Sequence, residues 1–303
     1  MFAIIGSGFG LYGYLPALAK NYPQKILLPK QYSNRFNKRP ELIRYASRID
    51  WVEDKDELLH RATGVVLAVR PEEQHAWVNC CVCIPGIRNI LLEKPLAASP
   101  EAASLILHTL KISGKEFRIA YTLKFTSWAI KLKNIIKNSN KYTVILLKWH
   151  FLAHHFRHDL KNWKLYSLSG GGAVRFYGIH IIALLSEMGY DTVQNVNAWG
   201  TSTNEIISWK ASFSGPSLPL FSIDVDTKSD QNLFEVKADC LEIVKQHDPF
   251  NTHKCNFGLD PRVSIISKHL NSFRFSGNRN FEWYNNCNIL WSLVEKNLNF
   301  EVA

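Results

Sequence analysis

Long apolar runs are missing from this 303-residue sequence, since no stretch approaches the roughly 20 consecutive apolar residues that a membrane-spanning helix needs. The composition, 46% hydrophobic and 20% charged, excludes a disordered chain and a collagen-like fibre. Cysteine is scarce as well: six residues in a chain of this length do not make a disulfide framework and indicate reduced thiols. Because residues 2–5 already read as a buried strand, we also expect no secretory leader, and therefore a cytoplasmic protein.

Acidic residues are nearly absent from one segment. Residues 124–175 contain ten Lys and Arg but a single acid, Asp159, whereas residues 176–303 contain ten basic and 14 acidic residues. The formal net charge of +10 is therefore local rather than spread along a tail. Such a field attracts anions, so the segment favours an anionic small molecule; a solvated helix face is the plain alternative, and nucleic acid is an unlikely partner.

The first 120 residues alternate short apolar runs with helix-like stretches. The apolar runs occupy residues 2–5, 25–28, 64–69 and 89–92. Continuous apolar strands that alternate with helices indicate a parallel sheet covered on both faces. We therefore predict an α/β fold whose residues 1–120 form a doubly wound, dinucleotide-binding Rossmann domain.

The pattern changes after residue 120. Residues 221–226 and 234–240 alternate apolar and polar side chains, which is typical of an antiparallel sheet with one covered and one open face. We predict that residues 121–303 form an α+β domain with an open, largely antiparallel sheet. This domain would bind substrate, and its open sheet face would join copies of the chain into a homo-oligomer, a dimer or a tetramer.

A glycine-rich loop follows the first predicted strand. In Gly6-x-Gly8-x-Gly10 the first glycine permits a tight turn, the second lets the backbone approach a phosphate, and the next helix offers its positive end. Leu11 replaces the third glycine of the usual G-x-G-x-x-G, so a plain strand-turn-helix is the alternative. The alternation of strands and helices that follows favours a dinucleotide site.

The second predicted strand does not end in an acid. Leu28 is followed by Pro29 and Lys30, with Arg35 soon after, where an acid usually binds the ribose hydroxyls. Basic side chains suit a 2′-phosphate, so the sequence favours NADP(H) as cofactor, with NAD(H) as the alternative. An ordinary surface loop would show the same residues.

Lys94 follows the apolar run 89–92 and precedes Pro95, which directs it toward the crevice where parallel sheets bind ligands. Further motifs accompany the triplet Glu93-Lys94-Pro95, in this order: Gly6–Gly10, Ala68-Val69-Arg70-Pro71 with His75, Tyr121-x-Leu123-Lys124-Phe125, and Gly170-Gly171-Gly172 leading into Gly178-x-His180. With these motifs the chain resembles the Gfo/Idh/MocA oxidoreductases, two-domain enzymes of sugar and polyol metabolism. The resemblance covers residues 1–190.

The resemblance implies a set of site residues. Lys94 would hydrogen-bond the reacting oxygen beside the nicotinamide, and His180 would be the general acid/base, for which an imidazole pKa of about 6.5 is suitable. The cofactor would contact Gly6, Gly8, Phe9, Gly10, Arg70, Pro71, His75, Glu93 and Lys94, and Lys30 and Arg35 from the basic loop. The substrate would contact Lys124, with Tyr121 and Arg175 also assigned to it.

Two positions depart from the family pattern. Phe176 stands where relatives carry an aspartate four residues before the histidine, and Ala183 replaces a second usual aspartate. Tyr177 could supply a phenol instead, although packing in an aromatic pair with Phe176 explains it as well. No metal site is predicted, because no cysteine or carboxylate cluster completes the histidines at 150, 154, 155 and 158.

Two hypotheses about function follow. The first is an NAD(P)-dependent oxidoreductase that transfers a hydride between nicotinamide and a CH–OH group of a sugar or sugar derivative. Its substrate would be nucleotide-linked or acidic, as in surface-polysaccharide biosynthesis. The second, which the missing aspartates admit, is a catalytically degenerate nucleotide- or sugar-binding sensor or partner protein of the same fold.

Overall fold

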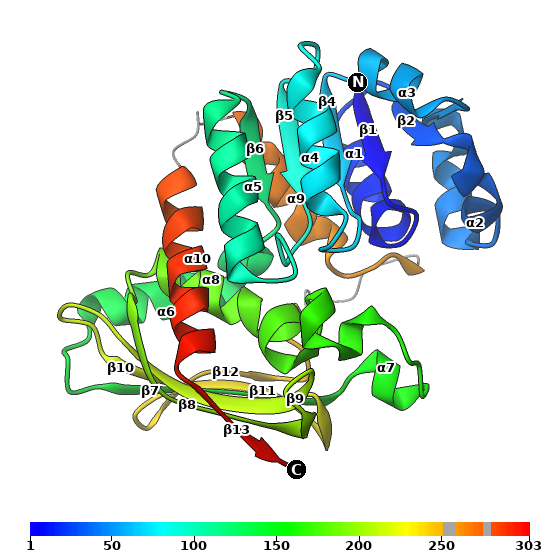
Figure 1. Cartoon of the computed structure of the whole chain (residues 1–303). Coiled ribbons are helices and arrows are strands. Elements are labelled where there is room, and N and C mark those ends of the chain that lie inside the picture. The colour runs from blue at the N-terminus through cyan, green and yellow to red at the C-terminus, as the bar shows by residue number, and fades with distance from the viewer. Residues whose placement is uncertain (251–257, 275–279) are drawn as a thin grey trace. The chain divides into compact units, whose positions relative to one another are not determined.

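The chain divides into two compact units (Figure 1). The computed structural model describes residues 1–250, 258–274 and 280–303. Unit 1 comprises Met1–Leu96, Leu105–Thr122 and Thr252–Phe281, and unit 2 comprises Ala97–Ser104, Leu123–Asn251 and Glu282–Ala303. One boundary between the units falls between Thr122 and Leu123, near the predicted division at residue 120, but the two units are not contiguous in sequence. A stretch near the C-terminus returns to unit 1.

The sheet of unit 1 has the strand order β3-β2-β1-β4-β5-β6, and each neighbouring pair is parallel. Its strands are β1 (Phe2–Ile5), β2 (Ile26–Pro29), β3 (Ile49–Val52), β4 (Gly64–Leu67), β5 (Asn89–Leu92) and β6 (Glu116–Ile119). The α-helices with residues in this unit are α1 (Leu15–Asn21), α2 (Ser33–Asn37), α3 (Lys55–Arg61), α4 (Gln74–Cys83), α5 (Pro100–Ile112) and α9 (Val263–Asn271). This strand order confirms the predicted doubly wound α/β architecture.

The return of α9 to unit 1 has a physical cause in the core. Strands β1, β2 and β4 are buried at every position, which requires cover on both faces of the sheet. Helices α1 and α9 share one apolar cluster with those strands, made of Ile4, Leu28, Val66, Leu15, Leu18, Val263, Ile266 and Leu270 with their neighbours. Asn21 at the end of α1 also donates a hydrogen bond to Ser267 in α9.

Unit 2 is built on a mixed sheet of order β12-β11-β7-β10-β9-β8-β13. Its strands are β7 (Val144–Leu152), β8 (Thr192–Ser202), β9 (Glu205–Ser214), β10 (Leu220–Asp226), β11 (Lys228–Ala238), β12 (Leu241–Gln246) and β13 (Leu298–Val302). Its helices are α6 (Ser127–Asn138), α7 (His154–Arg157), α8 (Ile179–Glu187) and α10 (Phe281–Lys296), which starts at the unit boundary. The neighbouring strands run antiparallel except β7 with β10 and β8 with β13. A largely antiparallel sheet was predicted, and this is confirmed.

Figure 1 shows α6, α8 and α10 over one face of this sheet. In β10 the side chains of Phe221, Ile223 and Val225 are buried, whereas the alternating polar side chains are only partly buried. The predicted alternation between a covered and an open face is therefore present. Assembly of copies through the open face stays a prediction.

Within the described residues, one helical stretch is long and apolar enough to cross a membrane by length and composition. It runs from Ser167 to Glu187, and 72% of its most apolar window is buried inside the fold. The sequence analysis did not single out this stretch. Such burial is typical of the core helix of a soluble protein, which passes the same length and composition test.

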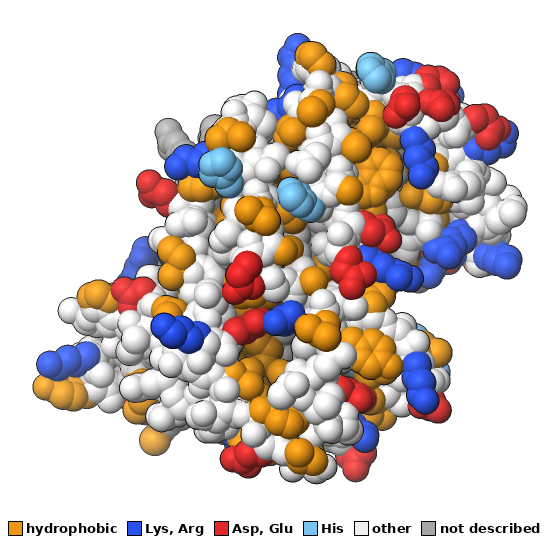
Figure 2. Space-filling view, in the orientation of Figure 1, with side chains coloured by type: hydrophobic (Ala, Val, Ile, Leu, Met, Phe, Trp, Pro, Cys, Tyr) orange, Lys and Arg blue, Asp and Glu red, His pale blue; other side chains and the backbone are white. Residues whose placement is uncertain are grey.

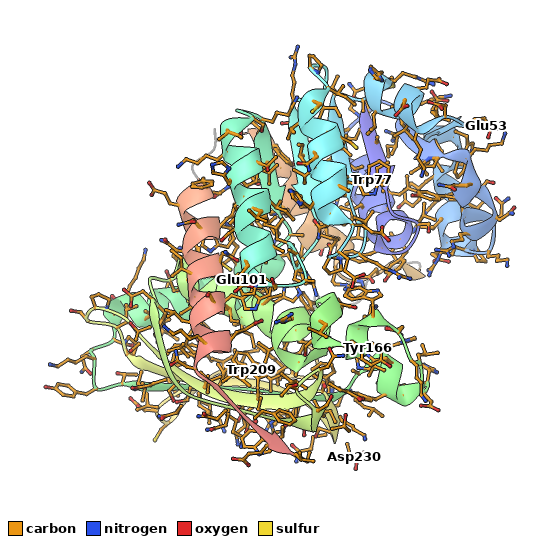
Figure 3. All side chains as sticks on the ribbon, viewed as in Figure 1. Glu53, Trp77, Glu101, Tyr166, Trp209 and Asp230 are labelled. Atoms are coloured by element: carbon orange, nitrogen blue, oxygen red, sulfur yellow. The ribbon has the colours of Figure 1, made fainter. Side chains whose placement is uncertain are left out.

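The position of α8 depends on a glycine. The π-helical turn Ala173–Gly178 leads directly into α8. A Cβ atom on Gly178 would lie 2.6 Å from Cζ2 of Trp209, a fully buried residue of β9 that Figure 3 labels. Glycine therefore allows the helix start to approach the indole ring closely. This contact fixes the position of His180, two residues further along.

We predict that Gly178→Ala lowers the free energy of unfolding by about 1–3 kcal/mol, because the added methyl group overpacks the contact with Trp209. The measurement is a denaturant titration of the full chain. In a Trp209→Phe background the smaller ring leaves room, so the same glycine substitution should cost less. An equal cost in both backgrounds would contradict the assigned contact.

Candidate active site

The glycine loop connects the carboxyl end of β1 to the π-helical turn Gly10–Tyr14, which continues into α1. Gly6 has a φ of +121°, and a Cβ atom there would lie 2.1 Å from the carbonyl oxygen of Ala68. At Gly8, in contrast, a Cβ atom would meet no atom within 4 Å, and the residue is exposed. Packing therefore requires the first glycine, while the space over the second is open. This open backbone, at the β1–β4 point where the strand order reverses, fits the pyrophosphate of a dinucleotide.

The segment after β2 contacts the glycine loop. The backbone N–H of Gly6 donates to the hydroxyl oxygen of Tyr32 at 3.0 Å, and Nη1 of Arg35 donates to Oγ of Ser7 at 2.5 Å. Burial is the main cause that raises the pKa of Tyr32. Arg35 thus contacts the glycine loop; its binding of a 2′-phosphate stays a prediction. Tyr32 was not predicted, because a tyrosine after a strand carries no distinctive signal.

Lys30, the other basic residue predicted to bind the cofactor, has a different partner. Its Nζ atom lies 2.5 Å from Oε1 of Glu53, and both side chains are largely exposed. Figure 3 labels Glu53 at the outer edge of unit 1, and Figure 2 shows acidic and basic side chains mixed over the neighbouring α3. The charge of Lys30 is thus balanced by an acid, and Arg35 is the member of the pair that contacts the glycine loop.

Glu93 follows the end of β5, and its side chain is partly buried. The hydroxyl of Tyr14 donates to its Oε1 at 2.5 Å, and the backbone N–H of Lys94 donates to its Oε2 at 3.2 Å. Burial raises the pKa of Glu93, and the charge of Lys94 opposes that rise. Burial, followed by the charge of Glu93, also raises the pKa of Tyr14 well above its ordinary value. The carboxyl group thus links the helix after the glycine loop to the loop that carries Lys94.

Gln74 holds the backbone on both sides of Lys94. It is completely buried at the start of α4, and its Nε2 donates to the carbonyl oxygens of Glu93 and Pro95, both at 2.8 Å. Its neighbour His75 is half-buried, and the preceding loop contains buried Pro71 and, one residue earlier, an exposed arginine, Arg70. Sequence reasoning missed Gln74, since a single glutamine before a histidine gives no recognisable pattern.

Arg262 is a second residue that the sequence did not reveal. Its Nε and Nη2 atoms bind the two carboxylate oxygens of Asp260 at 2.9 and 2.8 Å. Its guanidinium group lies 4.2 Å from the ring centroid of Phe9, which itself packs against Tyr12 and Tyr14. A cation is therefore held beside the glycine loop by a residue more than 250 positions away. Residues 176–303 have more acidic than basic residues, so their composition gave no sign of it.

His180 lies in unit 2, on the first turn of α8. Its side chain is buried, and its ring centroid lies 5.1 Å from that of Phe250. Tyr177, three residues earlier, packs edge-on against Trp149, Phe151 and Phe176, with ring centroids 4.8 to 5.8 Å apart. The structure thus shows Tyr177 in aromatic packing; its role in proton transfer stays a prediction.

Lys124 is tied to the helix that carries His180. Its Nζ atom lies 3.9 Å from the ring centroid of Trp283, and the indole N–H of Trp283 donates to the carbonyl oxygen of Ala183 at 2.8 Å. Ala183 is one turn beyond His180 in α8. A cation is therefore placed over an aromatic ring next to this helix. Tyr121, also predicted to contact substrate, is buried in unit 1.

Arg175 has a structural environment. Its guanidinium group binds both carboxylate oxygens of Glu295 at 2.7 and 2.6 Å and the carbonyl oxygens of Ala98 and Ser167 at 2.6 and 2.7 Å. The two bonds to Glu295 join the turn before α8 to α10, the other two join it to the segments of Ala98 and Ser167, and together they give Arg175 a supporting role. Its predicted contact with substrate receives no support from this arrangement.

The predicted catalytic pair is divided between the units, with Lys94 in unit 1 and His180 in unit 2. Their convergence on one nicotinamide ring therefore stays a prediction. Among residues 1–250, 258–274 and 280–303, no group of three or more His, Cys, Asp or Glu is placed to hold a metal ion.

Comparison with known proteins places the fold. No protein-family model matches the chain, and no curated protein matches it. The solved structure of the WlbA dehydrogenase from Bordetella pertussis with NADH and UDP-GlcNAcA is 14% identical; the match covers 98% of this chain and 95% of that one, with a TM-score of 0.74. WlbA from Thermus thermophilus with NAD and UDP-GlcNAcA is also 14% identical, over 100% and 96%, with a TM-score of 0.68.

A third solved structure has a different reaction type in its name. A variant of KijD10, a 3-ketoreductase from Actinomadura kijaniata in complex with TDP-benzene and NADP, is 12% identical over 100% of this chain and 98% of its own, with a TM-score of 0.67. At such identities the likeness shows the fold. The expected two-domain architecture is therefore confirmed over nearly the whole chain.

We predict that Glu93→Gln stabilises the protein at neutral pH. Burial raises the pKa of Glu93 above its ordinary 4.5, so the folded state binds this proton more tightly than the unfolded state. Stability is therefore lost as the pH rises through the folded pKa, and glutamine avoids this loss while it can still accept the Tyr14 hydrogen bond.

The check is the free energy of unfolding from urea titrations between pH 4 and pH 8. The advantage of Glu93→Gln should shrink steadily as the pH falls from 8 to 4, because below the ordinary pKa of 4.5 the carboxyl group is mostly protonated in the unfolded state as well. The exposed Glu53→Gln is the matched control and should show little pH dependence. A constant difference between Glu93→Gln and wild type across this range would show that Glu93 ionises normally.

Proposed function

We propose that the protein is a nicotinamide-dependent oxidoreductase that acts on a hydroxyl or carbonyl group of a nucleotide-linked sugar. The observation that carries this proposal is the open backbone over Gly8 at the carboxyl ends of the parallel strands, beside the Glu93-Lys94 loop. The likeness of fold supports it, because the neighbours with this architecture include dehydrogenases crystallised with NAD or NADH and UDP-GlcNAcA.

The cofactor would be held by residues of unit 1. The backbone of Gly8 and Gly10 and the positive end of the following helix suit the pyrophosphate, with Arg262 as a cation beside Phe9. When bound, a nicotinamide supplies or accepts the hydride. Glu93 and Gln74 keep the loop of Lys94 in one conformation, so that its amine is presented at the strand ends.

Two side chains, Lys94 and His180, would carry out the acid–base chemistry. In oxidation, the Lys94 ammonium would donate a hydrogen bond to the substrate oxygen, while the His180 imidazole takes the hydroxyl proton as the C–H bond gives up a hydride. In reduction, the same imidazole returns the proton. With Phe176 and Ala183 in place of carboxylates, ring packing against Phe250 is one contact that would orient His180.

Arg35 favours NADP(H), since it lies in α2, shortly after β2, where a basic side chain suits a 2′-phosphate. The neighbours include a complex with NADP as well as complexes with NAD and NADH.

We predict that Arg35→Ala weakens NADPH binding about tenfold or more and leaves NADH binding within about twofold, because one charge-assisted hydrogen bond to phosphate is lost. Lys30→Ala is the matched control: its ammonium is already paired with Glu53, so the affinity for NADPH should change less. Fluorescence titration with both cofactors gives the dissociation constants. An equal loss for NADH and NADPH would remove the 2′-phosphate assignment.

Compartment and assembly are further parts of the proposal. The cysteines at 80, 81, 83, 240 and 287 are free thiols, which supports a reducing, cytoplasmic compartment. The open face of the unit 2 sheet supports a homo-oligomer, because its partly buried polar strands offer a flat surface to a second copy.

A second candidate function is a nucleotide- or sugar-binding protein without turnover. The environment of Phe176 favours it: the ring packs edge-on against Trp163 and Tyr177, and the Lys164 amine lies 5.3 Å from its centroid. The position that carries an acid in relatives is thus a packed aromatic site. Tight cofactor binding without hydride transfer to any nucleotide sugar would select this alternative.

We predict that Lys94→Met and His180→Asn each lower kcat on an accepted nucleotide sugar by at least about 100-fold, as expected when a positioned acid or base is removed. The dissociation constant for the reduced cofactor should change little in His180→Asn. Lys25→Met, an exposed lysine next to the amino end of β2, is the control. Turnover is followed through nicotinamide absorbance, and full activity of either site variant would refute the assigned chemistry.

A further inference from the structure

A cavity of about 300 Å³ opens in unit 2 where β7 ends. Its walls come from three parts of the chain: the end of β7 with α7, the strand β11, and the segment after β12. None of the sequence motifs assigned above lines it. The lining side chains that carry chemistry are Phe151, His154, Arg157, Asn232, His247 and Asp248.

An irregularity in the sheet forms this cavity. Lys228 pairs with Leu152 and Leu233 pairs with His150, so five steps along β11 oppose two steps along β7. The extra residues bulge from the ladder, and Asn232 reaches the cavity wall from this bulge. Figure 3 labels Asp230 of the same bulge at the edge of unit 2. Bulges of this kind recur beside functional sites, where they redirect side chains.

The wall chemistry matches a nucleotide. Phe151 offers an aromatic ring, the Asn232 amide offers a donor and an acceptor, and Arg157 with two histidines supplies cationic or hydrogen-bonding groups. The ring of His247 is fixed, because its Nδ1 lies 3.0 Å from the carbonyl oxygen of Asn232. His154 and Arg157 belong to the segment 124–175, in which Asp159 is the single acid. Arg157 and the histidines thus offer cationic or hydrogen-bonding groups to an anion, and Asp248 is the acid in the same wall.

Two wall residues connect the cavity to His180. Asp248 accepts the backbone N–H of Phe250 at 2.7 Å, and the Phe250 ring contacts the His180 ring. On the other side, the Phe151 ring lies 4.9 Å from the ring of Tyr177, one helical turn before His180. The cavity wall is thus linked to the surroundings of His180 through Phe250 and Tyr177.

We propose that this cavity binds the nucleoside diphosphate part of the nucleotide-linked sugar. The base would lie on Phe151 with its edge read by Asn232, and the diphosphate would lie against Arg157 and the histidines. The sugar would then extend toward His180. This inference rests on the proposed function and adds the subsite that selects the substrate class.

The test is isothermal titration calorimetry of the full chain with UDP and with TDP, each in the absence and presence of saturating NADPH. Arg157→Met should weaken the binding of whichever diphosphate binds wild type about tenfold or more, since a charge-assisted contact is lost. Asn232→Ala should weaken the binding of both diphosphates by similar factors, because uracil and thymine present the same hydrogen-bonding edge to the Asn232 amide. Lys161→Met, an exposed lysine of the same basic segment outside the cavity, should bind like wild type.

Each outcome has one consequence. Diphosphate binding that survives saturating NADPH and is weakened by Arg157→Met but not by Lys161→Met supports the cavity. Diphosphate binding that NADPH abolishes would place the diphosphate in the dinucleotide site and overturn the cavity proposal. Undiminished affinity in Arg157→Met, or no binding of either diphosphate, would overturn it as well.

The proposed function fails separately. Hydride transfer to sugars without a nucleotide, unaffected by UDP and by Arg157→Met, would retain the oxidoreductase and reject the cavity. Cavity-specific diphosphate binding in a chain that binds neither nicotinamide cofactor would retain the cavity and reject the oxidoreductase.

Discussion

Burial of the Glu93 carboxyl group is the constraint on which the rest of unit 1 depends. An ionised carboxylate in the interior is costly unless hydrogen bonds replace water, and here the Tyr14 hydroxyl and the Lys94 amide do so only in part, because the pKa remains raised. The group is retained because it joins the helix after the glycine loop to the loop of Lys94. Such incompletely compensated groups are typical of sites that bind or react.

In unit 2, aromatic packing instead of a charged group joins the segments around the candidate site. The start of α8 is set by the close contact of Gly178 with Trp209, and Trp283 connects the middle of that helix to Lys124. No carboxylate stands at 176 or 183 to make the imidazole of His180 more basic. In the proposed mechanism, proton transfer by His180 would therefore depend in part on ring packing around α8.

Sequence alone predicted the elements whose pattern is local. The apolar runs at 2–5 and 89–92 form β1 and β5. The glycine loop lies, as expected, at the end of β1, where the strand order of the sheet reverses. The sequence did not reveal the edge strands β3 and β6, because they carry polar residues. In β6, for example, Arg118 is fully buried, and its guanidinium group lies 4.9 Å from the ring centroid of Phe273. Nor could it reveal Arg262, since its place beside Phe9 arises from packing of α9 on α1.

In the basic segment 124–175, the strand order decides which of the cationic side chains line a cavity. Ten cations among residues 124–175 favoured an anionic ligand but gave no location for one. The strand order β12-β11-β7 supplies that location, because it brings Asn232 and His247 beside the end of β7, where His154 and Arg157 follow. Lys30 is the counterexample: an equally basic residue near the predicted cofactor, it is paired with Glu53 at the surface. A cation contributes to recognition where the fold leaves it facing a cavity, and net charge alone does not determine that.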